Sequence, residues 1–146
     1  MREILFRGKR IDSELWVEGS LVNNIFFRAG TNRPVPYIIN PDEYEEYCCM
    51  EDIGELAVEV IEDTVGQFTG LVDRNGKRIF EGDIVKYAEG YHHWSGEYNK
   101  ATVVEFVGGS FYPFCGCGGE YSMSTDYAIV IGNIYDNSDL MKEIIK

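Results

Sequence analysis

The sequence predicts a mainly β protein with minor helix, and three observations carry this prediction. Short runs of β-branched and aromatic residues recur along the whole chain of 146 residues. Glycine and asparagine separate these runs at points where a chain of short strands must reverse. Apolar residues make up 45% of the chain and aromatic residues 14%, which is enough to form a buried core.

The first forty residues favour β structure. Residues 3–7 and 15–22 are two β runs around a polar turn and are typical of a hairpin. Residues 25–27 and 37–39 are two further short strand candidates. A short helix is then expected from Asn40 to Cys48, because Asn40 can cap it, Pro41 suits the first helical position, and acidic residues follow.

The rest of the chain continues in short strands. The expected strands are residues 57–61, 68–72, 78–80, 84–87, 101–107, 110–114 and 127–131. Asn75-Gly76 is the strongest hairpin signal, and residues 78–80 should pair back across it. Residues 88–100 are polar and should form a long loop. A closing helix is expected from Ser138, with apolar residues on one face.

These elements suggest two subdomains. Residues 1–75 are expected to form an N-terminal β subdomain with an acidic, partly helical insertion near 40–55. Residues 76–146 are expected to form a small SH3-like barrel with a closing helix. The reason is the order of a tight turn into a strand, a long loop, a hairpin and a last strand. Barrels of this kind serve many functions, so the fold by itself predicts none.

The negative charge is concentrated in one segment. The net charge is −12, and residues 34–73 contain eleven carboxylates and no Lys or Arg. This charge disfavours direct binding to nucleic acid, with the basic N-terminal strand as the exception. The segment is either a solvated acidic face or a surface for a basic protein partner, in which case it could also mimic nucleic-acid charge. We predict an exposed binding patch, whose members are Asp42, Glu43, Glu45, Glu46, Glu51 and Asp52.

The sequence favours no cofactor. Cys48, Cys49, Cys115, Cys117, His92 and His93 offer zinc-binding atoms. Their spacing does not suit zinc, because structural sites use Cys pairs two to four residues apart and the gap between Cys115 and Cys117 is one residue. We therefore expect free thiols and no metal.

The sequence also shows no catalytic motif. It lacks Gly-x-Ser-x-Gly, a Walker motif and Gly-x-Gly-x-x-Gly. No apolar run approaches the roughly 20 residues that span a bilayer, and the start does not resemble a signal peptide, so a cytoplasmic location without membrane attachment is expected.

Several motifs together resemble one protein family. The motifs are residues 6–10 (FRGKR), 16–21 (WVEGSL), 65–71 (VGQFTGL), 73–77 (DRNGK), 79–85 (IFEGDIV) and 130–135 (VIGNIY). In these stretches the chain resembles the YopX family, whose members are small proteins of phages and prophages. The resemblance spans nearly the whole chain and is weakest over residues 23–56 and 88–126. It carries no catalytic residues over to this sequence.

The leading hypothesis is a non-enzymatic accessory protein of a phage or prophage that binds another macromolecule in the cytoplasm of a bacterial host. One alternative is a small enzyme, metal-dependent or not, that uses the Cys and His loops. Another is a self-assembling structural protein, because short β edges and the apolar face of the closing helix can be covered by another copy.

Overall fold

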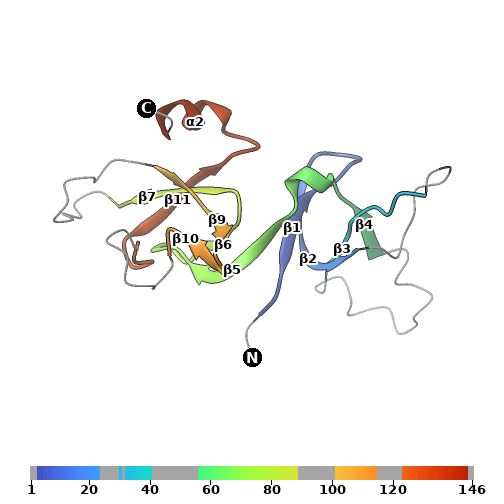
Figure 1. Ribbon diagram of the computed structural model, residues 1–146, viewed down its shortest axis with the longest axis horizontal. Coiled ribbons are helices and arrows are strands. Elements are labelled where there is room, and N and C mark those ends of the chain that lie inside the picture. The colour runs from blue at the N-terminus through green and yellow to red at the C-terminus, as the bar shows by residue number, and fades with distance from the viewer. Residues whose placement is uncertain are drawn as a thin grey trace. The chain divides into compact units, whose positions relative to one another are not determined.

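The computed structural model describes residues 3–23, 30, 32–40, 56–88, 101–114 and 123–144. These residues are mostly in antiparallel strands, which confirms the predicted fold class (Figure 1). The chain divides into two compact units, Met1–Gln67 and Phe68–Lys146. None of the helices in the described ranges has the length and apolar character needed to cross a membrane. The expected strand at 25–27 and helix at 40–48 lie outside the described residues.

The first unit is built on antiparallel strands. They are β1 (Phe6–Lys9), β2 (Trp16–Val22), β3 (Tyr37–Ile39) and β4 (Ala57–Glu59), followed by the 3-10 helix η3 (Glu62–Thr64). Their hydrogen-bonding order is β4-β3-β2-β1. Strands β1 and β2 form the predicted hairpin, with Phe6 opposite Gly19 and Lys9 opposite Trp16. The turn between them is closed by the amide of Arg10, which donates to the carbonyl of Leu15 at 2.9 Å.

Glycine at position 19 is required by the packing of β2 on β3. A Cβ atom added to Gly19 would collide with the backbone carbonyl of Ile39. Gly19 is buried, so the neighbouring strand has no room to move aside. The close approach of the β3 backbone therefore explains why the motif at residues 16–21 has glycine at position 19.

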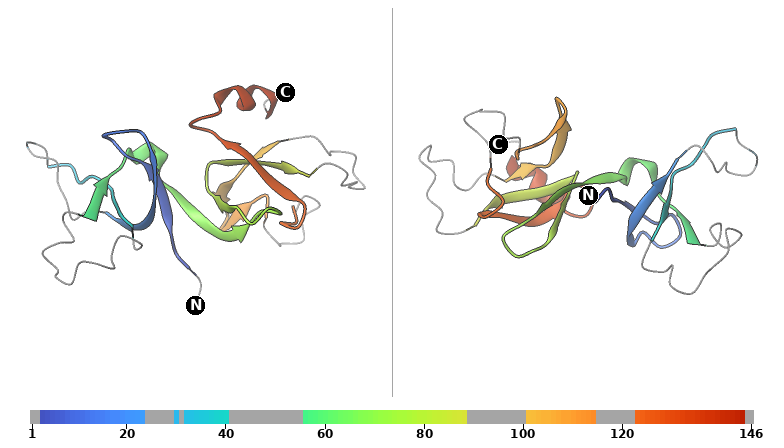
Figure 2. Two further views of the ribbon diagram at one scale, coloured as in Figure 1. Left: turned by 180° about the vertical axis from the view of Figure 1, so that it is seen from behind. Right: turned by 90° about the horizontal axis from the view of Figure 1, so that it is seen from below.

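The second unit contains most of the remaining strands. They are the main part of β5 (Gly66–Val72), β6 (Arg78–Phe80), β7 (Asp83–Tyr87), β8 (Thr102–Val103), β9 (Glu105–Val107), β10 (Ser110–Tyr112) and β11 (Ala128–Asn133), with helix α2 (Ser138–Ile144) at the end. The first two residues of β5 belong to the first unit, where they pair with β1. In the second unit β5 pairs with β6, β7 lies between β11 and β8, and β9 pairs with β10. Figure 2 shows the ribbon from two further sides, with α2 in red beside the C-terminus.

The closed SH3-like barrel expected for residues 76–146 is not confirmed. Among the described strands, β7, β8 and β11 form one open sheet, β9 and β10 form another, and β5 and β6 lie at one end of the six-stranded sheet. None of these sheets is closed. The strand expected over 101–107 is also interrupted, at Val104. The amide of Val104 donates to the carbonyl of Asp83, and its own carbonyl accepts from Gly82, both at 2.8 Å. The chain therefore pairs with β7 before Val104 and with β10 after it.

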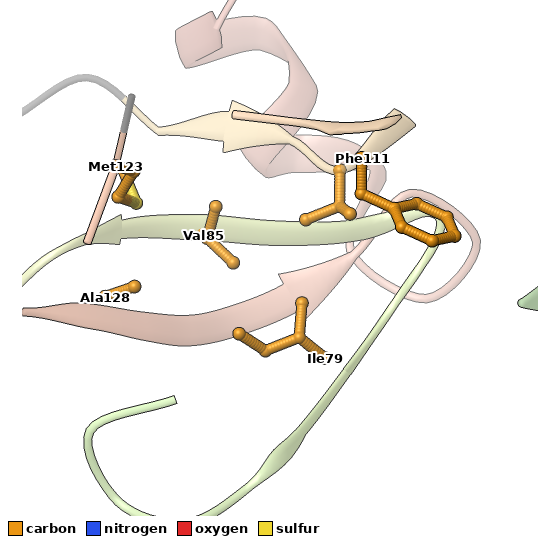
Figure 3. Packing of buried hydrophobic residues seen from close by; sticks show 6 residues of the cluster. Ile79, Val85, Phe111, Met123 and Ala128 are labelled. Carbon is orange, nitrogen blue, oxygen red and sulfur yellow. The ribbon is translucent and has the colours of Figure 1, made fainter. Parts of the chain in front are cut away.

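The core of the second unit collects side chains from several strands. Its buried members are Ile79, Val85, Val104, Phe111, Met123 and Ala128. Figure 3 shows five of them labelled, with Val85 on β7 and Ala128 at the start of β11. Ile79, Val85, Val104 and Ala128 are completely buried. Burial of a side chain as large as Val or Ile contributes roughly 1.5–3 kcal/mol to the free energy of unfolding.

Candidate binding groove in the first unit

The residues that the sequence suggested for function lie outside the described part of the chain. These are the acidic patch Asp42, Glu43, Glu45, Glu46, Glu51 and Asp52, and the Cys and His residues at 48, 49, 92, 93, 115 and 117. Among the residues that the structure does describe, no group of three or more Cys, His, Asp or Glu is placed to hold a metal ion. The acidic patch stays a prediction.

A pocket of ≈ 370 Å³ lies in the first unit and was not foreseen from the sequence. Its described lining comes from three stretches: Ile11 after β1, residues 33–36 before β3, and residues 59–62 at the end of β4. The lining residues are Ile11, Arg33, Val35, Pro36, Glu59, Val60, Ile61 and Glu62. We call this feature the groove. Five of the eight are apolar, and the three others are charged.

Backbone hydrogen bonds hold the three stretches of the groove together. The amide of Val60 donates to the carbonyl of Pro36 at 3.1 Å, which ties the end of β4 to the residues before β3. The amide of Ile61 donates to the carbonyl of Lys9 at 2.8 Å, and the amide of Ile11 donates to the carbonyl of Glu59 at 3.1 Å. Arg10 and Val60 thus form a bridge, which brings the chain after β4 alongside the chain after β1. The groove is therefore built on fixed backbone.

A buried threonine fixes the chain where it leaves the groove. The hydroxyl of Thr64 accepts a hydrogen bond from the amide of Lys9 at 2.9 Å and donates to the carbonyl of Ile61 at 2.7 Å. The first bond connects η3, on which Glu62 lies, to the end of β1, and the second closes η3 on the residue before it. Thr64 is only 6% exposed, so its hydroxyl satisfies backbone groups that water reaches poorly.

The groove lining includes one exposed ion pair. Nη2 of Arg33 lies 2.7 Å from Oε2 of Glu62, and both side chains are largely exposed. Glu59 is half-buried and also lines the groove. An exposed ion pair of this kind contributes at most about 1 kcal/mol, so Arg33 and Glu62 can separate at little cost. With one cation and two carboxylates, the described lining carries a net charge of −1.

The basic residues of β1 stack on one aromatic ring. The guanidinium carbon of Arg7 lies 4.7 Å from the ring centre of Trp16, and Nζ of Lys9 lies 5.6 Å from it. Arg7 is only 8% exposed. Both distances are in the range of cation–π attraction. The cations of this strand thus take part in its packing, which gives the FRGKR motif a structural role.

The central family motifs are also used for folding. The Oδ1 atom of Asp73 accepts hydrogen bonds from the amides of Asn75 and Lys77, which closes the Asn-Gly turn as predicted. Asp83 is 1% exposed, and its Oδ2 atom accepts from the amide of Phe80 at 2.8 Å. Carboxylates that accept backbone amides in this way hold turns together.

The closing motif forms a second turn of the same kind. The side-chain oxygen of Asn133 accepts hydrogen bonds from the amides of Tyr135 and Asp136. The side-chain oxygen of Asn137 accepts from the amide of Asn133 at 3.1 Å. The amide of Ile134 donates to the carbonyl of Gly82, so the closing motif is bound to the central one.

Sequence reasoning missed the groove for a physical reason. The sequence pattern predicts only a strand at residues 57–61, and that prediction is local. The groove depends on hydrogen bonds between residues separated by more than twenty positions in the chain, such as Pro36 and Val60. A usable signal was the pair of apolar residues Val60 and Ile61 directly between Glu59 and Glu62, which places carboxylates beside apolar side chains.

Comparison with known proteins identifies the family and the fold. The family model described as YopX protein matches residues 32–142. The crystal structure of protein EF1440 from Enterococcus faecalis is similar, with 21% sequence identity, a TM-score of 0.52, and coverage of 97% of this chain and 99% of that one. At this identity the likeness concerns the fold alone. Comparison with curated proteins gave no match. Because the matched region is well over half of the chain, this protein belongs to the YopX family.

Proposed function

We propose that this chain is an accessory protein of a phage or prophage that acts by binding another macromolecule. The observation that carries the proposal is the groove, whose described lining combines five apolar with three charged residues. Binding sites commonly combine these two properties, because the apolar surface supplies affinity and the charged groups orient the ligand. Membership of the YopX family is consistent with the proposal and adds no catalytic residues.

We further propose that the partner is a basic protein. Residues 34–73 contain eleven carboxylates and no Lys or Arg, and those carboxylates that share a face must repel one another. A basic surface would relieve that repulsion and would be steered toward the protein from a distance. In this proposal an exposed patch binds this partner, and its members are Asp42, Glu43, Glu45, Glu46, Glu51 and Asp52.

The test is partner capture with a charge-neutral variant. Glu43, Glu45, Glu46 and Glu51 are replaced together by Gln, and both proteins are used to capture partners from a host-cell lysate at several salt concentrations. We expect weaker capture by the variant and a shallower salt dependence, with the fold retained. Capture of the same partners with the same salt dependence would show that this segment is only a solvated face.

A second candidate is self-association, and one observation favours it. Strand β9 is exposed along its whole length, and Phe106, Val107 and Tyr112 of the β9–β10 hairpin are between 40% and 58% exposed. Apolar residues on an exposed hairpin can pair with another copy. Light scattering over a range of protein concentrations tests this, and a mass that stays at one chain throughout would remove the candidate.

A further inference from the structure

We propose that the groove receives a single lysine or arginine side chain of the basic partner. This inference rests on the proposed function and names the group that is recognised. The groove has a volume of ≈ 370 Å³, near the lower end of the range of roughly 300–1,000 Å³ for ligand pockets. A space of this size suits one long side chain better than an extended ligand.

The lining matches the two parts of such a side chain. Ile11, Val35, Pro36, Val60 and Ile61 provide apolar surface, and Glu59 and Glu62 line the same groove. Lys and Arg have an apolar stem and a charged end, and they commonly lay the stem on apolar surface while the charge stays near water. A purely apolar side chain would contact only the apolar lining residues, and a carboxylate would be repelled by the two glutamates.

The charge of the whole unit supports a cation over an anion. Residues 1–67 contain six Lys and Arg against fourteen Asp and Glu, which gives the unit a net charge of −8. The described groove lining is itself −1. The long-range potential of the unit therefore favours a cationic side chain over phosphate or carboxylate.

Arg33 is then an internal competitor for the ligand. Its guanidinium is 2.7 Å from Glu62, which is the carboxylate that an incoming cation would use. Because the side chains of Arg33 and Glu62 are 76% and 62% exposed, their ion pair is weak and can be exchanged for another. This arrangement makes an unusual prediction: loss of the groove's own cation should strengthen binding, and loss of its carboxylate should weaken it.

The test uses short synthetic peptides and the full chain. The probe is an acetylated peptide with one arginine between small neutral residues, and its matched controls carry norleucine or glutamate at the same position. NMR of protein with labelled Ile and Val methyl groups reports whether Ile11, Val35, Val60 and Ile61 respond. We expect these methyl signals to shift with the arginine peptide, less with norleucine and not with glutamate.

Two variants and two matched controls give the direction of the effect. Glu62→Gln should weaken arginine-peptide binding roughly two- to five-fold, and Arg33→Gln should strengthen it by a similar factor. Lys142 and Asp139 form a comparable exposed ion pair on α2, at 3.1 Å. Asp139→Asn and Lys142→Gln change the net charge equally without touching the groove, so they should leave binding nearly unchanged. Thermal unfolding of each variant checks that its fold is retained.

The outcomes separate this inference from the proposed function. Equal shifts with norleucine and arginine, or equal effects of the groove and α2 variants, would overturn the groove inference. If in that case the Gln variant of residues 43–51 still weakens capture of a basic partner, the proposed function stands without it. If the groove responds as expected but no basic protein is captured, the groove inference stands and the basic-partner proposal fails.

Discussion

The carboxylate of Asp73 accepts a hydrogen bond from the backbone amide of Val130 at 3.0 Å. The two residues are 57 positions apart, so this bond connects the Asn-Gly turn between β5 and β6 to the middle of β11. The amide of Arg74 donates to the carbonyl of Ala128 and reinforces the same junction. Two of the family motifs therefore meet at Asp73.

Replacement of Asp73 by Ala should be strongly destabilising. It removes the acceptor for three backbone amides, those of Asn75, Lys77 and Val130, and Asp73 is only 5% exposed. Hydrogen bonds to a charged group contribute about 1.5–3 kcal/mol each, and losses at one residue are not additive, so we expect about 2–4 kcal/mol in total. Denaturant unfolding measures this, and exposed Asp126→Asn is the control. A loss under about 1 kcal/mol would contradict the role assigned to Asp73.

Glycine at position 82 should be more sensitive to alanine than glycine at position 76. Both have left-handed backbone, with φ of +83° and +82°. A Cβ at Gly82 would lie 3.1 Å from Cε2 of Tyr135, whereas nothing lies within 4 Å at Gly76. Gly76→Ala should therefore cost only the backbone strain of roughly 1–2 kcal/mol, and Gly82→Ala more. Equal free energies of unfolding for the two variants would show that Tyr135 moves aside freely.

Val104 and Val107 form a matched pair for the interrupted strand. Val104 is completely buried in the core, and Val107 is 58% exposed on β9. We expect Val104→Ala to lower the free energy of unfolding by about 2 kcal/mol or more, because a cavity replaces the lost methyl groups. Val107→Ala should change it by less than about 0.5 kcal/mol. A larger loss at Val107 would place that side chain in an interface or in the core.

The carboxyl of Asp12 should titrate at unusually low pH. Hydrogen bonds from the side chain of Arg10, and then from Ser13, lower the pKa of Asp12 from 3.8 to about 2. Because the folded-state pKa lies below the unfolded one, the stabilisation is present above pH 4 and is lost as the pH falls toward 2. NMR titration of the full chain measures this pKa directly. In Arg10→Gln the pKa should return toward 3.8, and an unchanged value would exclude the Arg10 bonds of 2.8 and 3.0 Å as its cause.

The strands were predictable where their pattern is local. The hairpin around residues 10–15, strands β3, β6, β7 and β11, and helix α2 follow the apolar runs and turn residues that predicted them. The Asn75-Gly76 turn was predictable because few other residues adopt positive φ there without strain. The limits of the strands were harder to predict. The strand expected over 101–107 is interrupted because the backbone of Val104 forms hydrogen bonds with Asp83 and Gly82, which are distant in the sequence.

The fold class, the family and the acidic character of the chain were predictable from residue order alone, because each is a property of composition or of short motifs. The tertiary structure accounts for three further features. It interrupted the strand at Val104, it placed the two family motifs around Asp73 and Val130, and it assembled the groove from Ile11, residues 33–36 and residues 59–62. All three depend on hydrogen bonds between residues far apart in the chain. Such bonds form only when strands pair, and no local pattern of residue types specifies them.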